Sequence, residues 1–173
     1  MALAIAGVIV LLPSAAHAQV RTFRDQRNDT SWVDLTKIRV HFAKRLRVVI
    51  HYRQDPVDFR TGFDIWIDTK AKNPGPEYRY SFIPESDASF FNHVDGWTGL
   101  GRDTGCYGVH GVRVRVPGNG TTTKPVRVSF PGRCLGKPHR ARVAIRSQNT
   151  DGTRSSIDWA PKRRTFYGWV KRF

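Results

Sequence analysis

Apolar and polar residues alternate most clearly over one short stretch of this chain. Within residues 63–68, phenylalanine and isoleucine alternate with aspartate and tryptophan. Side chains alternate with a period of two only in a strand, so this stretch predicts a strand with one buried face. A turn-forming segment follows over residues 72–76, and residues 77–82 alternate again. The pattern predicts a β-hairpin with one apolar face and one polar face.

The same alternation recurs in other short stretches that are separated by turn residues. We expect further strands over residues 36–42, 46–52, 89–94, 112–116, 126–130, 141–145 and 166–170, and a polar loop over residues 149–156. No stretch has a sustained helical period, and ten prolines and fifteen glycines suit turns. Eight or nine short strands predict an all-β fold, an antiparallel jelly-roll-like β-sandwich, with a closed barrel as the alternative.

The first 18 residues differ from the rest of the chain. They carry no Lys, Arg, Asp or Glu, and they end in Ala16, His17 and Ala18, the small-x-small pattern of a signal peptidase site. The apolar run over residues 3–12 is too short to span about 30 Å of hydrocarbon. We therefore expect export, with a signal peptide at 1–18, a flexible leader at 19–31, a single sandwich domain at 32–173 and no transmembrane segment after cleavage.

The chain is strongly basic. It has 29 Lys and Arg residues against 14 Asp and Glu residues, a formal net charge of +15, and 21 of the basic residues are arginines. Such a charge favours binding to polyanions, here an anionic polysaccharide or a cell-wall polymer; specific nucleic-acid binding is not expected. The alternative is an ordinary solvated surface, because the charge is spread along the sequence rather than clustered.

Arginines occupy outward positions in several of the predicted strands. If these strands share a sheet, the guanidinium groups form a cationic face whose forks match phosphate and carboxylate geometry. The alternative is a solvated outer face whose charges discourage aggregation between sheet edges. The candidate polyanion-binding residues are Arg113, Arg115, Arg127, Arg140 and Arg142.

Cys106 and Cys134 are the two cysteines of the chain. In an exported protein an isolated pair most simply forms one disulfide. Their spacing fits no common zinc pattern, and one pair cannot fill a four-ligand site. We therefore expect a disulfide between them.

Asp64, Trp66 and Asp68 share the polar side of the strand over residues 63–68. An indole can stack on the apolar face of a sugar while flanking carboxylates accept hydrogen bonds from its hydroxyls, so the three form a candidate ligand-binding site. In the alternative, the aspartates face water and Trp66 is covered by a loop or by another tryptophan: Trp97, Trp159 or Trp169.

The sequence names no catalytic residue, metal or cofactor. A Gly-x-Ser-x-Gly motif and metal-binding histidine spacings are absent. A glycosidase needs two carboxyl groups at a defined separation, which a sequence does not show. The acidic residues that could hold calcium lack the spacing of a calcium loop; they are Asp64, Asp68, Glu77, Asp95 and Asp103.

Three short motifs carry a resemblance to known proteins: FDIWIDT at 63–69, GPEY at 75–78 and CLGKP at 134–138. With them the chain resembles small exported β-sandwich proteins of high-GC Gram-positive bacteria, which are largely uncharacterised. Its hairpin is similar to carbohydrate-binding and DOMON-like sandwiches, which bind sugars or sometimes haem. Because Met1, in the predicted signal peptide, is the sole methionine, a methionine-ligated haem is not expected. The resemblance implies no catalytic residues.

These observations favour an exported, non-catalytic, disulfide-linked β-sandwich that binds anionic polymers at the cell envelope or outside the cell. A carbohydrate-active enzyme or carbohydrate-binding module that uses the Trp66 face is the alternative. A structural or interaction protein of the envelope without a small ligand is the third hypothesis.

Overall fold

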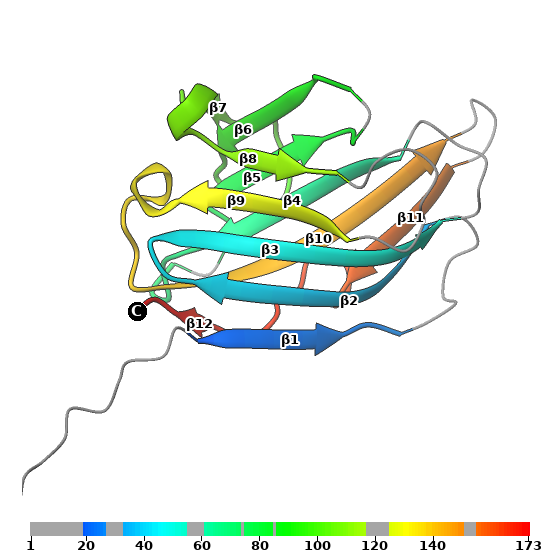
Figure 1. The fold of residues 1–173 in the computed structure, drawn as a ribbon, viewed down its shortest axis with the longest axis horizontal. Helices are drawn as coiled ribbons and strands as arrows, with labels where there is room; N and C mark the ends of the chain where they lie inside the picture. Colours follow the sequence, from blue (N-terminus) through cyan, green and yellow to red (C-terminus); the bar gives the residue numbers. More distant parts are fainter. Residues whose placement is uncertain are drawn as a thin grey trace, which may run out of the picture.

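The chain folds into two antiparallel β-sheets that lie face to face (Figure 1). The computed structural model describes residues 19–26, 33–54, 61–73, 75–84, 86–116, 125–150 and 155–173, so the predicted signal peptide at 1–18 lies outside the described residues. The described part contains twelve strands and two short 3₁₀ helices. The predicted antiparallel β-sandwich is confirmed, with more strands than the eight or nine expected.

The first sheet has five strands in the order β1-β2-β3-β9-β8. These are β1 (Val20–Arg24), β2 (Val33–Phe42), β3 (Arg45–Gln54), β9 (Val126–Pro131) and β8 (Arg113–Arg115). Residues 43 and 44 connect β2 to β3 as a tight hairpin. The sheet therefore brings strands together that lie about 80 residues apart in the sequence.

The second sheet has seven strands. Six of them follow the order β11-β10-β4-β5-β6-β7, and β12 pairs with β10 beyond this path. The strands are β4 (Gly62–Asp68), β5 (Tyr78–Phe82), β6 (Ser89–His93), β7 (Arg102–Asp103), β10 (Arg140–Thr150), β11 (Ser155–Ala160) and β12 (Val170–Lys171). The predicted hairpin at 63–82 is present as β4 and β5.

The apolar positions of the alternating strands meet between the two sheets. On β4, Phe63, Ile65 and Ile67 are buried, and Ile145 on the neighbouring β10 is buried beside them. The five-stranded sheet contributes its own inward row, which includes Ile38, Val40, Phe42, Leu46, Val48, Ile50, Val126, Val128 and Phe130. Burial of these side chains is the main force that holds the sheets together.

The expected flexible leader at 19–31 is wrong for part of its length. Val20–Arg24 is strand β1, paired with β2 from Val20–His41 to Arg24–Lys37. The ring of Phe23 stacks on that of Tyr167 with centroids 4.4 Å apart, which fixes this edge strand against the C-terminal segment. Residues 27–31 lie outside the described residues.

Two further predictions near the C-terminus are corrected. The polar loop expected at 149–156 instead contains the end of β10 and the start of β11, while residues 151–154 lie outside the described residues. The alternation of apolar residues does not predict strand β11, because one of its buried positions is Asp158. The Oδ2 atom of Asp158 accepts a hydrogen bond from the Leu35 backbone N–H at 2.6 Å. The closing strand expected at 166–170 is wrong except at Val170, which begins β12.

The predicted disulfide is present. Cys106 and Cys134 are bonded, with their Cα atoms 6.0 Å apart. Cys106 lies just before the 3₁₀ helix η1 (Gly108–His110), and Cys134 lies within the 3₁₀ helix η2 (Gly132–Leu135). The bond therefore joins the segment between β7 and η1 to η2, which follows β9.

Replacing both cysteines (Cys106→Ser with Cys134→Ser) should lower the free energy of unfolding by about 3.5 kcal/mol. The two residues are 28 positions apart, and on the chain-entropy model the unfolded chain regains the freedom of that closed loop. Urea denaturation measures the change, and the wild-type protein in a reducing agent serves as the control. An unchanged urea midpoint would contradict the prediction.

Candidate functional site

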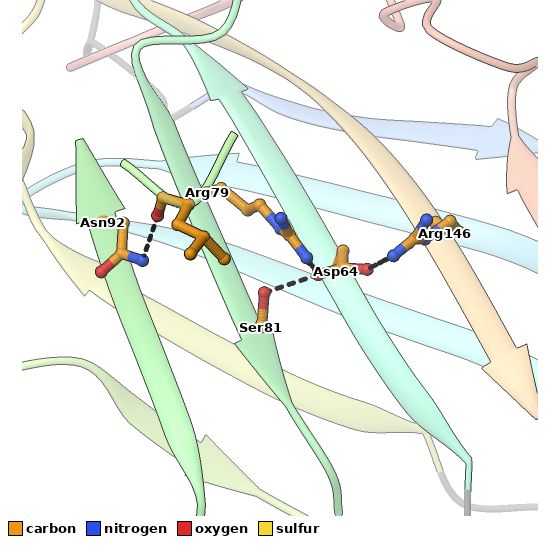
Figure 2. A network of polar contacts seen from close by, with 6 residues as sticks. Asp64, Arg79, Ser81, Asn92 and Arg146 are labelled. Atoms are coloured by element: carbon orange, nitrogen blue, oxygen red, sulfur yellow. Dashed lines mark hydrogen bonds and ion pairs between the residues drawn. The ribbon is translucent and has the colours of Figure 1, made fainter. Parts of the chain in front are cut away.

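A network of polar side chains joins β4, β5 and β10 on the outer side of the seven-stranded sheet (Figure 2). Asp64 on β4 lies at its centre and is only 6 % exposed. Its Oδ1 accepts from Arg79 Nε at 2.9 Å and from Ser81 Oγ at 2.5 Å. Its Oδ2 accepts from Arg146 Nε at 2.9 Å and Nη2 at 2.5 Å. Beside this network, Asn92 Nδ2 donates to the Leu100 carbonyl. Two guanidinium forks therefore share one carboxylate.

Asp68 forms a second buried ion pair at the end of β4. It is 0 % exposed, and its Oδ2 accepts from Arg142 Nε at 2.7 Å and Nη2 at 2.6 Å. Its Oδ1 accepts the Lys70 backbone N–H at 2.9 Å. The Arg142 guanidinium lies over the rings of Phe166 and Trp169, 4.8 and 4.6 Å from their centroids. Both oxygens of Asp68 therefore have partners within the protein.

Trp66 is covered by other aromatic side chains. It is 2 % exposed, and its ring stacks on Trp159 with centroids 4.8 Å apart and an interplanar angle of 20°. The Trp97 ring is tilted against Trp66 with centroids 5.8 Å apart, and it meets Trp159 edge-on with centroids 6.1 Å apart. The guanidinium groups of Arg79 and Arg146 lie 5.5 and 5.4 Å from the Trp66 centroid. A sugar could stack on this indole only after other side chains moved away.

The candidate ligand site at Asp64, Trp66 and Asp68 therefore forms a packed layer in this structure. The alternative for Trp66, cover by Trp97 or Trp159, matches the contacts. The expectation that the two aspartates face water is wrong, because both are buried and paired with arginines. Their charges hold this layer on the sheet.

The outer side of the five-stranded sheet is different in character. Residues that pair directly across antiparallel strands project on the same side, so the pairing defines rows of neighbours. One row is Thr22, Arg39, Val49, Arg127 and Arg115. The next row is Val20, His41, Arg47, Ser129 and Arg113, and a third is Arg24, Lys37 and His51. These three rows contain no Asp or Glu.

We call this surface the cationic face and define it by Arg24, Lys37, Arg39, Arg47, Arg113, Arg115 and Arg127. Lys37 is half-buried and the six arginines are exposed. Arg115 and Arg127 pair directly across β8 and β9, an arrangement of like charges that destabilises a sheet. Neighbouring strands lie about 4.8 Å apart, so the row from Arg39 to Arg115 extends over about 14 Å.

The positive charge of this face acts on His51. Burial is the main cause that lowers the pKa of the His51 imidazole. Neighbouring positive charges lower the same pKa further, those of Lys37, Arg39 and Arg127. A proton is therefore harder to add here, as expected where cations lie together without carboxylates.

The structure divides the predicted polyanion-binding residues between the two sheets. Arg113, Arg115 and Arg127 lie together on the cationic face. Arg140 and Arg142 lie on β10 of the other sheet, and Arg142 is paired with Asp68. Arg140 is exposed, with its guanidinium 4.7 Å from the Trp169 centroid. The five residues therefore do not form one surface.

The cationic face includes residues that the predicted set lacks. Arg39 and Arg47 are outward in the alternating pattern, as expected from the sequence, but their proximity to Arg127 and Arg113 depends on strand order. That order is set by the pairing of β3 with β9. The alternation of apolar and polar residues predicts which side chains of a strand point outward, but it does not predict which strands lie next to each other.

Three remaining properties of the described residues bear on function. No group of three or more His, Cys, Asp or Glu side chains is placed to bind a metal ion among them. No helix in the described part has the length and apolar character needed to cross a membrane. No protein-family model, curated protein or solved structure matches the chain.

Proposed function

We propose that this protein is an exported binding protein that holds anionic polymers on its cationic face, at the cell envelope or outside the cell. The observation that carries the proposal is that three neighbouring rows on the five-stranded sheet carry charge of one sign. On the seven-stranded sheet, Arg79, Arg142 and Arg146 are matched to Asp64 and Asp68. On the five-stranded sheet, three cross-strand rows hold seven cations and no carboxylate.

A surface that serves only solubility does not need this arrangement. Ordinary surfaces intersperse both signs of charge, whereas a field of one sign attracts a partner of the opposite sign. Arginine forks suit the sulfate, phosphate and carboxylate groups of such polymers. Cations that follow one another across the strands of a sheet suit an extended chain with repeated anionic groups. The ligand class proposed is therefore a sulfated, phosphorylated or uronic-acid polymer.

Replacing Arg115 and Arg127 with serine should weaken polymer binding and leave stability unchanged or slightly higher. The pair lies on β8 and β9, at one edge of the cationic face, and binding to a heparin-like polysaccharide or a polyglycerol phosphate should lose two ion pairs. Each ion pair releases counterions, so the slope of log K against log salt should become smaller in magnitude by about two. The repulsion between the directly paired arginines also disappears.

The matched control removes two charges that do not belong to the cationic face. Lys162→Ser with Arg163→Ser changes exposed residues in the segment that follows β11. Calorimetric titration at several salt concentrations should show a smaller loss for this control than for the Arg115 and Arg127 variant. Equal losses would mean that net charge alone attracts the polymer. Tight binding of a neutral polysaccharide, independent of salt, would contradict the proposal.

A further inference from the structure

A hollow of about 310 Å³ lies at one end of the sandwich, beside the cationic face. The β2–β3 turn, the segment that follows β9 and the C-terminal strand meet at this end (Figure 1). The lining cations are Lys44, Arg45, Arg113, Arg133, Lys137 and Arg172. His110 also lines the hollow, and none of the lining residues carries a carboxylate. Its volume is at the lower end of the range for small-ligand pockets.

The cations around this hollow are held close to one another against their mutual repulsion. Burial is the main cause that lowers the pKa of the Arg45 guanidinium, and the charges of Arg113, Arg47 and Arg133 lower it further. The guanidinium of Arg172 lies over Gly132, 3.7 Å from the position that a Cβ would occupy there. An anion at this place would replace repulsion with attraction on several sides.

Hydrogen bonds to the backbone hold the segments that line the hollow in place. Arg45 Nη2 donates to the carbonyls of Gly111 and Ser129, both at 2.8 Å, and its Nε donates to Ser129 Oγ at 2.6 Å. Arg133 Nη2 donates to the His110 carbonyl at 2.8 Å. The Gly132 backbone N–H donates to the Lys44 carbonyl at 3.1 Å. The guanidinium groups of Arg45 and Arg133 are thus positioned before any ligand arrives.

The disulfide joins two of these segments. Cys106 precedes η1, which contains the lining residue His110. Cys134 follows the lining residue Arg133 within η2. The Val112 backbone N–H donates to the Cys106 carbonyl at 3.1 Å, which folds the η1 segment back toward β8. The bond therefore keeps the cations of η2 next to those of β3 and β8.

We propose that this hollow is a discrete binding site for a phosphomonoester, with the doubly charged phosphate group among the cations. A phosphomonoester approaches two negative charges at pH 7 and has three acceptor oxygens, whereas a phosphodiester carries one charge. Several guanidinium and ammonium groups around one hollow favour the higher charge. The remaining volume accommodates the alcohol part, so a phosphomonoester should bind at least as well as inorganic phosphate. The site does not depend on polymer binding by the cationic face.

Titration of the ¹⁵N-labelled protein with glucose 6-phosphate, inorganic phosphate and dimethyl phosphate at constant ionic strength tests the site. Glucose 6-phosphate should give saturable shifts of the amides at Gly111 and at residues 132–137. Dimethyl phosphate should bind at least tenfold more weakly. Tighter binding of inorganic phosphate than of glucose 6-phosphate would overturn the proposed ligand, and shifts that do not saturate would overturn the site.

Two variants separate this site from the cationic face. Arg133→Gln with Lys137→Gln should weaken glucose 6-phosphate binding at least tenfold, while Arg115→Ser with Arg127→Ser should change it less than twofold. If the NMR spectrum of the first variant shows that it is unfolded, Arg172→Gln takes its place and should also weaken glucose 6-phosphate binding. Equal losses in both variants would overturn the discrete site. Polymer binding is measured separately, so a failure of either proposal leaves the other testable.

Discussion

Replacing Asp64 with alanine should lower the free energy of unfolding by about 4 kcal/mol without loss of polymer binding. Its carboxylate is the shared acceptor of Arg79 and Arg146, at 2.9 and 2.5 Å. Removing one partner of a buried ion pair leaves the opposite charges without compensation, which costs more than the pair itself contributes. The two guanidinium groups also lose the geometry that holds them beside the Trp66 ring. Urea denaturation measures the loss of stability.

Two comparisons sharpen this measurement. Asp95→Ala removes the same charge from an exposed position and should cost about 0.5 kcal/mol or less. Asp64→Ala combined with Arg146→Met should cost less than the sum of the single changes, because the second change removes a charge that the first leaves unpaired. A cost for Asp64→Ala no larger than that of Asp95→Ala would show that the network does not stabilise the fold. Loss of polymer binding by the folded variant at low temperature would show that the polymer site depends on this network.

The fold was predictable where the alternation of the sequence coincides with burial. On β4 the alternation places Phe63, Ile65 and Ile67 in the core, and all three are buried. On β11 the relation is reversed, since Asp158 faces the other sheet and binds the Leu35 N–H. A buried aspartate of this kind accepts the hydrogen bond of a backbone N–H on a strand that is distant in the sequence, and no local sequence pattern predicts it.

The candidate site was predictable only in part, for a related reason. Local alternation assigns Arg39, Arg127 and Arg142 to outward positions on their own strands. Strand order then places Arg39 and Arg127 in one row and Arg142 on the opposite side of the sandwich. The side chains that cover Trp66 also come from segments that are distant in the sequence, because Trp97 lies in the loop after β6 and Trp159 lies on β11. Contacts between distant segments therefore decide which polar face is open to a partner.

Replacing Trp66 with alanine should lower the free energy of unfolding by about 4 kcal/mol, because it empties the centre of the layer on the seven-stranded sheet. The indole is 2 % exposed and packs on Trp159 at 4.8 Å and Trp97 at 5.8 Å. A buried tryptophan truncated to alanine leaves a large cavity in addition to the lost transfer free energy. Urea denaturation followed by far-ultraviolet circular dichroism measures the effect without relying on the removed fluorophore.

Trp66→Phe is the matched control for this change. The buried indole Nε1 has no hydrogen-bond partner, so phenylalanine sacrifices contact area but no hydrogen bond and should cost about 1 kcal/mol. The pair of variants also decides between a structural layer and a sugar platform. A platform would make Trp66→Ala nearly neutral for stability while it abolished binding to a soluble neutral polysaccharide in affinity electrophoresis. A packed layer predicts the reverse: the alanine variant melts early, and the wild-type protein does not bind the neutral polysaccharide.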